Sequence, residues 1–128
     1  MALTNAGRNF IAAAIMNNGP PTWFDNSNAY IGVGDSTTAF AADQTDLQAA
    51  SNKVRVGMDS TYPTISTNVL TFQATFESGV GNFDWEEWAV FNASSAGTML
   101  CRKVEDNGTK SSGQTWVFQV QLTISIGS

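Results

Sequence analysis

The sequence predicts a mainly β protein, a small antiparallel β-sandwich or open barrel with one N-terminal α-helix. The strongest observation is the alternation of apolar and polar residues in 116–126 and again in 68–76, because neighbouring side chains of a strand point to opposite faces of a sheet. A second observation is that Gly, Pro and Asn recur between such runs, as they do in the turns between short strands. We expect one domain that spans residues 1–128.

Helical periodicity is confined to a segment near the N-terminus. Apolar side chains recur there at spacings of three and four residues, at Phe10, Ile11, Ala14 and Ile15. Thr4 is placed to cap the first turn of this helix, and Gly19 with Pro20 is expected to stop it. Residues 45–52 are expected to add at most one further helical turn.

The remaining regular segments are predicted to be strands. They cover 29–34, 53–58, 68–76, 83–91, 98–104 and 116–126. Residues 98–104 follow the turn-rich 92–97 and are expected to form a hairpin with 83–91. Apolar residues occur on both faces of 83–91, with Trp85 and Trp88 on opposite faces, which is typical of a strand covered on both sides. The N-terminal helix or a neighbouring subunit is expected to provide the second cover.

Composition and charge exclude several functional classes. Charged residues make up only 13% of the chain, roughly half the usual share in globular proteins, so the surface is thinly protected against association. The net charge of −5 argues against nucleic-acid binding, which needs clustered Lys and Arg. No apolar run approaches the roughly 18 residues of a membrane span, and the N-terminus lacks the pattern of a signal peptide. We therefore expect a mature, soluble chain with no membrane partner.

No catalytic, cofactor-binding or metal-binding residue is predicted. The chain contains no His, which removes Ser-His and Cys-His catalysis and the imidazole ligands of metal sites. Its single Cys101 excludes an internal disulfide and agrees with synthesis in a reducing cytoplasm. Asp84 and Glu86 would share one face of a strand about 7 Å apart, within the range of inverting glycosidases, but any two carboxylates so spaced do the same.

The Gly-x-Gly at 32–34 lacks the further residues of a nucleotide-binding loop. We expect these glycines to allow a tight exit from the strand. The segment 25–28, DNSN, resembles the start of a calcium loop but lacks the glycine and the distal Glu that such a loop requires.

The order of three segments resembles bacteriophage virion proteins, notably the N-terminal domain of phage tail-collar fibre proteins and related small phage structural proteins. The segments are ALTNAGRNFIAAAI, YIGVGDSTTAFAADQTDLQ and FDWEEWAVFNASSAGTMLCRKV. The residues that match the family pattern are Leu3, Thr4, Ala6, Gly7, Ile31, Val33, Gly34, Asp35, Thr45, Leu47, Glu87, Val90, Phe91, Gly97 and Leu100. Ala89 stands where the family usually has glycine.

The resemblance implies a non-enzymatic virion structural protein, made in the cytoplasm of the bacterial host and located on the particle. Tail-collar fibre proteins continue into a long shaft, whereas this sequence ends at Ser128, so we expect a fibre-attachment or adaptor protein of the tail or baseplate. The alternative is a capsid decoration (cement) protein on the head. More remote alternatives are a carbohydrate-binding module that uses Trp23, Trp85 and Trp88, and the glycosidase considered above.

Self-association and docking on other virion proteins, of the tail, the baseplate or the major capsid protein, are the expected mechanism. A homo-oligomer is expected, with a trimer as the first guess because closed rings suit both locations. Large aromatic residues are the usual anchors of interfaces, and the candidate interface residues are Trp23, Phe24 and Trp88. Trp23 and Phe24 lie in a loop, where such side chains are either tucked under the loop or held out for a partner.

Overall fold

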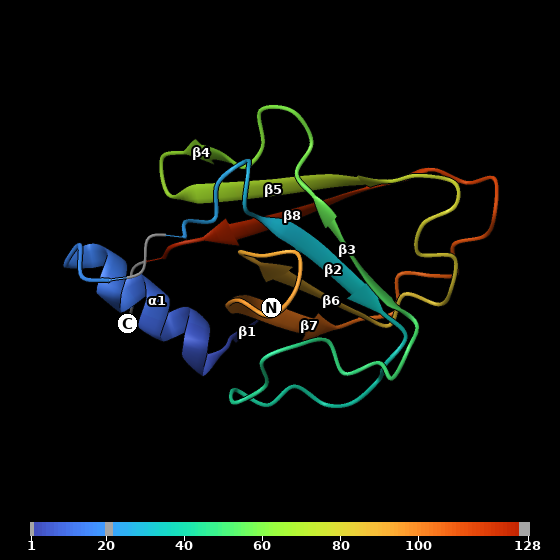
Figure 1. The fold of residues 1–128 in the computed structure, drawn as a ribbon, viewed down its shortest axis with the longest axis horizontal. Coiled ribbons are helices and arrows are strands. Elements are labelled where there is room, and N and C mark those ends of the chain that lie inside the picture. Colours follow the sequence, from blue (N-terminus) through green and yellow to red (C-terminus); the bar gives the residue numbers. More distant parts are fainter. Residues whose placement is uncertain (1, 20–21, 126–128) are drawn as a thin grey trace.

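A computed structural model, which describes residues 2–19 and 22–125, consists of two antiparallel β-sheets and one short helix (Figure 1). The mainly β fold with a single N-terminal helix is therefore confirmed for these residues. In chain order the elements are β1 (Ala2–Leu3), α1 (Asn5–Ile15), β2 (Tyr30–Gly34), β3 (Lys53–Gly57), β4 (Thr64–Ser66), β5 (Val69–Phe76), β6 (Glu87–Phe91), β7 (Met99–Val104) and β8 (Trp116–Thr123).

The two sheets enclose the main hydrophobic core. Five strands form one sheet in the order β1-β7-β6-β2-β3, and three form the other in the order β4-β5-β8. The core takes apolar side chains from both sheets. Trp88 of β6 and Phe118 of β8, for example, meet across the core with ring centroids 5.9 Å apart. The predicted hairpin is confirmed, since β6 and β7 pair antiparallel.

Helix α1 packs at the β7 side of this core. Thr4 caps it as predicted: its hydroxyl accepts a hydrogen bond from the Gly7 N–H at 2.9 Å and donates one to the Met99 carbonyl. Gly7 is buried against β7, where a Cβ would overlap the Leu100 carbonyl. The helix ends at Ile15, earlier than the predicted stop at Gly19, because Asn17 already has a positive φ of 52°. The other predicted stop residue, Pro20, lies outside the described residues.

The outer face of the five-stranded sheet is covered by the connection between β2 and β3, residues 35–52. All five residues of β6 are buried, so the prediction of a strand covered on both sides is confirmed. The cover is neither the helix nor a second subunit, however. Leu47 of the connection packs on Phe91 of β6 and forms a second apolar cluster there.

The glycines at 32 and 34 make this close covering possible. A Cβ on Gly32 would lie 2.8 Å from the Phe91 ring and 2.9 Å from Leu47, and a Cβ on Gly34 would overlap the Glu87 carboxylate. The two glycines thus admit side chains of β6 and the connection, rather than only letting the chain leave the strand.

Three further predictions differ from the structure. Residues 45–52 form no helical turn, because their backbone bonds to the sheet instead. The strand predicted at 83–91 begins only at Glu87, so side-chain alternation does not extend back to Trp85. The short strand β4 lies in a segment predicted to be a loop, and β8 ends at Thr123; the last residue predicted in that strand, Ile126, lies outside the described residues.

Candidate functional site

Large apolar side chains are exposed at one end of the molecule. The helix α1, strand β4 and the C-terminal end of β8 all lie toward this end of the long axis (Figure 1). We call the following set the apolar end: Ile15, Met16, Trp23, Ile65 and Ile124. Their exposed fractions run from 42% for Trp23 to 82% for Ile15. Exposed hydrophobic surface that gathers in one region is typical of a site of protein association.

An aromatic cluster fixes the loop after α1 on the helix. The ring of Phe10 meets Phe24 edge-to-face at a centroid distance of 5.0 Å and Trp23 at 5.8 Å. Phe24 also packs against the main core, whereas Trp23 remains 42% exposed. Of the two alternatives predicted for these side chains, Phe24 is tucked under the loop, whereas Trp23 is held out toward solvent.

An apolar cavity lies beside this cluster. It has a volume of about 200 Å³ and lies where α1 meets β5, β7 and β8. Its lining residues are Phe10, Ile11, Phe24, Leu70, Phe72, Leu100, Leu122 and Ile124. The cavity connects the apolar end to the core, because Ile124 belongs to the first and Phe72 to the second.

Trp88, the third candidate interface residue, lies in the core between the sheets. It is only 7% exposed, and its indole N–H donates to Oε1 of Glu105 at 3.2 Å. The hydrogen bond from Lys103 holds the pKa of Glu105 below its usual value, and the bond from Trp88 acts in the same direction. Trp85 is 1% exposed and lies in the same core, contrary to the prediction that the two rings face opposite ways.

The carboxylates Asp84 and Glu86 are placed before β6 rather than within a strand. Asp84 accepts a hydrogen bond from the Thr109 hydroxyl. Desolvation, together with the charges of Asp106 and Asp84, raises the pKa of Glu86. Neither Asp84 nor Glu86 lines the apolar cavity or the polar hollow described below.

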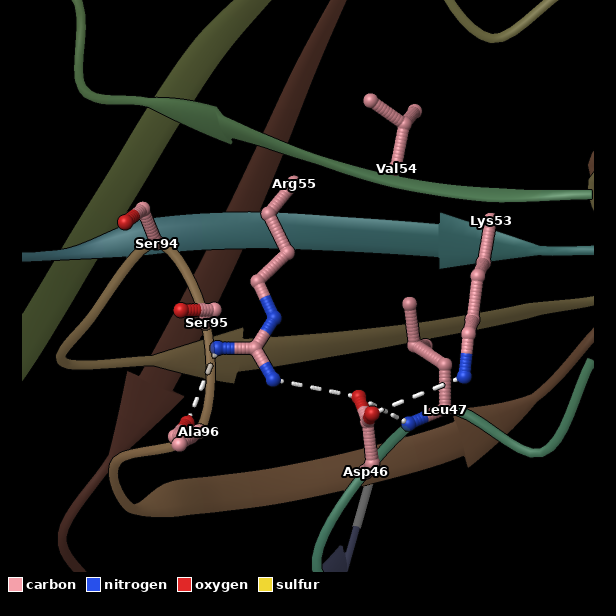
Figure 2. A pocket seen from close by; sticks show the side chains of 8 residues that line it. All are labelled: Asp46, Leu47, Lys53, Val54, Arg55, Ser94, Ser95 and Ala96. Atoms are coloured by element: carbon pink, nitrogen blue, oxygen red, sulfur yellow. Dashed lines mark hydrogen bonds and ion pairs between the residues drawn. The ribbon is translucent and has the colours of Figure 1, made fainter. Parts of the chain in front are cut away.

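A polar hollow of about 230 Å³ lies between the 35–52 connection, β3 and the β6–β7 turn (Figure 2). Arg55 donates to Asp46 at 3.1 Å and to the carbonyls of Ala93 and Ala96, at 2.8 and 3.0 Å. Burial alone would raise the pKa of Asp46, but the Leu47 N–H and the cations Arg55 and Lys53 outweigh it and lower the pKa.

The charged groups of this hollow are therefore paired with one another, since Arg55 and Lys53 both lie within ion-pair distance of Asp46. The guanidinium of Arg55 also lies 3.4 Å from the centroid of the Phe91 ring. Arg55 thus fastens the β6–β7 turn and the 35–52 connection to β3.

Within residues 2–19 and 22–125, no group of acidic, Cys or His side chains is arranged to hold a metal ion. In the same part of the chain, no helix is long and apolar enough to cross a membrane. Cys101 is buried in the core, and burial raises the pKa of its thiol to about 12.

Sequence reasoning missed four of the five residues of the apolar end. Ile15 lies on the predicted apolar face of the helix, yet only the structure shows that the helix extends past the sheets and leaves it exposed. The exposure of Met16 could have been predicted. It directly follows Ile15 in the sequence, and a further apolar residue directly after the apolar face of a helix cannot share the buried side. Ile65 and Ile124 had none: Ile65 lies outside the predicted strands, and Ile124 belongs to the apolar face of the predicted strand 116–126, where burial is the expectation.

Comparisons with known proteins add no further information on identity: no protein-family model matches the chain, and no curated protein matches it. The fold and the surface define a small two-sheet β domain with one helix and an exposed apolar end. Conclusions about its function rest on these features and on the sequence motifs.

Proposed function

We propose that the protein is a non-enzymatic structural component of a bacteriophage particle. It associates with copies of itself and docks on the particle exterior as a fibre-attachment or adaptor protein of the tail or baseplate. The apolar end is the observation that carries this proposal, since it provides exposed apolar side chains on which a partner can dock. The phage assignment itself comes from the order of the sequence motifs.

The chemistry of the apolar end supports docking on protein rather than binding of a small ligand. The cores of protein interfaces are depleted of charge and enriched in aromatic residues and Met, and this surface offers Trp23 and Met16 beside isoleucines. Trp23 is held in place by Phe10, which lowers the entropy lost when a partner covers it. An anchor of this kind is typical of interface hot spots.

Sugar binding receives less support from the same geometry. A stacking platform needs exposed aromatic faces, but Trp85 and Trp88 are 1% and 7% exposed. Among the three tryptophans considered for that role, only Trp23 presents its ring to solvent.

The copy number of this chain in purified phage particles tests the virion proposal. Quantitative mass spectrometry relative to the major capsid protein is expected to give a small, ring-sized number for a tail or baseplate location. Near-capsid abundance would instead make it a head decoration protein, and absence from the particle would refute the proposal.

A variant pair tests whether the apolar end is the docking surface. Replacing Trp23 by Ala is expected to lower the occupancy of the chain on particles at least tenfold, since hot-spot truncations cost about 2 kcal/mol or more. Ser78 lies in the β5–β6 loop at the opposite end of the molecule (Figure 1), so Ser78→Ala is the matched control. Equal occupancy for both variants would show that docking uses another surface.

A further inference from the structure

Strand β8 forms an edge of the three-stranded sheet. It pairs with β5 along its whole length, from Trp116 opposite Phe76 to Thr123 opposite Val69. Among the strands of the described residues, β5 is its only hydrogen-bonded neighbour. The other side of β8 therefore presents backbone groups that no strand within residues 2–19 and 22–125 pairs.

The alternation of hydrogen-bonding direction along β8 identifies these backbone groups. The Ile124 N–H donates to the Asn68 carbonyl at 2.9 Å, toward β5. Successive residues of a strand direct their N–H and C=O to alternate sides. The even-numbered residues of β8 therefore also bond β5. Each of the four odd-numbered residues of β8 directs its N–H and its C=O toward the free edge. These residues are Val117, Gln119, Gln121 and Thr123.

This edge lacks the devices that usually protect a sheet from pairing with other chains. Natural edges carry charged side chains, prolines or bulges. Residues 111–125 contain no charged residue and no proline, and the register between β5 and β8 is unbroken. By contrast, β3, at an edge of the other sheet, carries Lys53 and Arg55.

We infer that β8 pairs antiparallel with β8 of a second copy, around a two-fold axis at Val120. This register places Val117 opposite Thr123 of the second copy and Gln119 opposite Gln121 of the second copy. All four edge-facing residues then form hydrogen-bonded pairs, each of which exchanges two N–H···O=C bonds. The two three-stranded sheets join into one continuous sheet across the dimer.

The side chains favour a second copy over a foreign segment. On the outward face the pairing sets Gln against Gln and Val against Thr, and on the inward face it sets Phe118 against Leu122 of the second copy. No charges meet along the paired strands, whereas a charged peptide would find no counter-charge on β8. The exposed Val117 and Ile124, 59% and 61% exposed, become partly covered.

The inferred assembly is a two-fold dimer in place of the trimer that we expected from the sequence. An isologous contact of this kind uses the same strand on both copies. It rests on β8 alone, and it stands whether or not the chain belongs to a phage particle.

Sedimentation equilibrium of the purified chain tests the inference with two variants at one position. The Gln119 N–H faces away from β5, so Gln119→Pro keeps the bonds between β5 and β8 but removes an edge donor, as edge strands allow. We expect a dimer for the native chain and for Gln119→Ala, and a dimer Kd raised more than about tenfold for Gln119→Pro. Circular dichroism verifies that Gln119→Pro folds. A monomeric native chain, or a folded Gln119→Pro variant that dimerises as well as Gln119→Ala, would overturn the inference.

Charge variants test the register. In the Q119K/Q121K variant, lysines stand opposite each other in two pairs, which is expected to raise the dimer Kd about tenfold. In Q119K/Q121E each lysine faces a glutamate of the second copy, so dimerisation is retained. A register shifted by one pair in either direction would set like charges opposite each other in both variants, at position 119 or at position 121. Equal weakening of the two would therefore contradict the axis at Val120.

Discussion

Glu87 of β6 and Arg102 of β7 form an ion pair, with Oε1 of the first 2.8 Å from Nε of the second and both side chains completely buried. The backbone N–H groups of Gln48 and Ala49 donate to the same carboxylate, each at 2.9 Å. Arg102 donates in turn to the Thr38 carbonyl at 2.9 Å and to the Gln44 side chain at 3.0 Å. The pair therefore ties the 35–52 connection to the sheet.

Removing one member of this pair is expected to destabilise the fold strongly. In Arg102→Met the Glu87 carboxylate stays buried without its counter-ion, and breaking a buried pair in this way costs about 3–5 kcal/mol. Urea unfolding measures the loss, and hydrogen exchange is expected to become faster at Gln48 and Ala49.

The exposed pair of Lys103 and Glu105 provides the control for that experiment. Their side chains are 42% and 39% exposed and lie 2.8 Å apart. Lys103→Ala is expected to cost less than about 1 kcal/mol, because solvent screens such pairs. If Arg102→Met cost no more than this control, the buried pair would not be what holds the connection.

Gly34 and Gly57 give a matched test of how closely the connection is packed. Ala at 34 places a methyl group on the Glu87 carboxylate, whereas Ala at 57 places it 3.6 Å from the Tyr30 ring, an ordinary contact. Overpacking costs about 1–3 kcal/mol, so Gly34→Ala is expected to lower the free energy of unfolding by that amount more than Gly57→Ala. Equal values in thermal or urea unfolding would show that Glu87 moves aside without cost.

The sequence predicted those parts of the fold that depend on local periodicity. Alternation located β5 and β8, and the Thr4 cap located the start of α1. It did not predict the cover of β6, because the bonds of Glu87 to Gln48 and Ala49 join positions almost forty residues apart and have no periodic signature. The one sequence feature that indicates the buried ion pair is the charged Glu87 within the otherwise apolar strand β6.

The candidate site was predictable only in part, for a similar reason. Trp23 and Phe24 were identified by residue type and by their place in a loop. Trp88 has the same residue type, but its burial depends on Phe118 from the other sheet. The other members of the apolar end are set by where α1 and β8 stop relative to the sheets, which local patterns do not encode.

Cys101 is expected to be unreactive toward thiol reagents in the folded protein. Burial raises the pKa of its thiol to about 12 from the ordinary 9.0, and only the thiolate is nucleophilic. Labelling with iodoacetamide at pH 8 is expected to be slow, because it is limited by the small unfolded fraction, and to become rapid in urea. Labelling of the native protein as fast as in urea would show that the thiol is accessible.

The same shift gives a pH dependence of stability. Below pH 9 the thiol is protonated in both states, whereas between about pH 9 and 12 only the unfolded chain ionises. The contribution of Cys101 to stability is therefore constant below pH 9 and is lost progressively as the pH rises through that window. Cys101→Ala removes this term, so the difference in unfolding free energy between native chain and variant is expected to shrink above pH 9.

Alanine variants of Trp88 and Trp23 are expected to distinguish residues that stabilise the fold from residues that bind a partner. Trp88 fills the core against Phe118, so Trp88→Ala is expected to cost about 3–5 kcal/mol and to leave the native mass of the folded fraction unchanged. Trp23→Ala loses one edge-to-face contact with Phe10, worth about 1 kcal/mol, and is expected to lose binding to its docking partner. Urea unfolding measures the stability of both variants, native mass spectrometry measures the association of folded Trp88→Ala, and occupancy on particles measures the docking of Trp23→Ala. A lower native mass for folded Trp88→Ala would place that ring at a subunit contact after all, since a cavity in the core alone cannot change the number of associated chains.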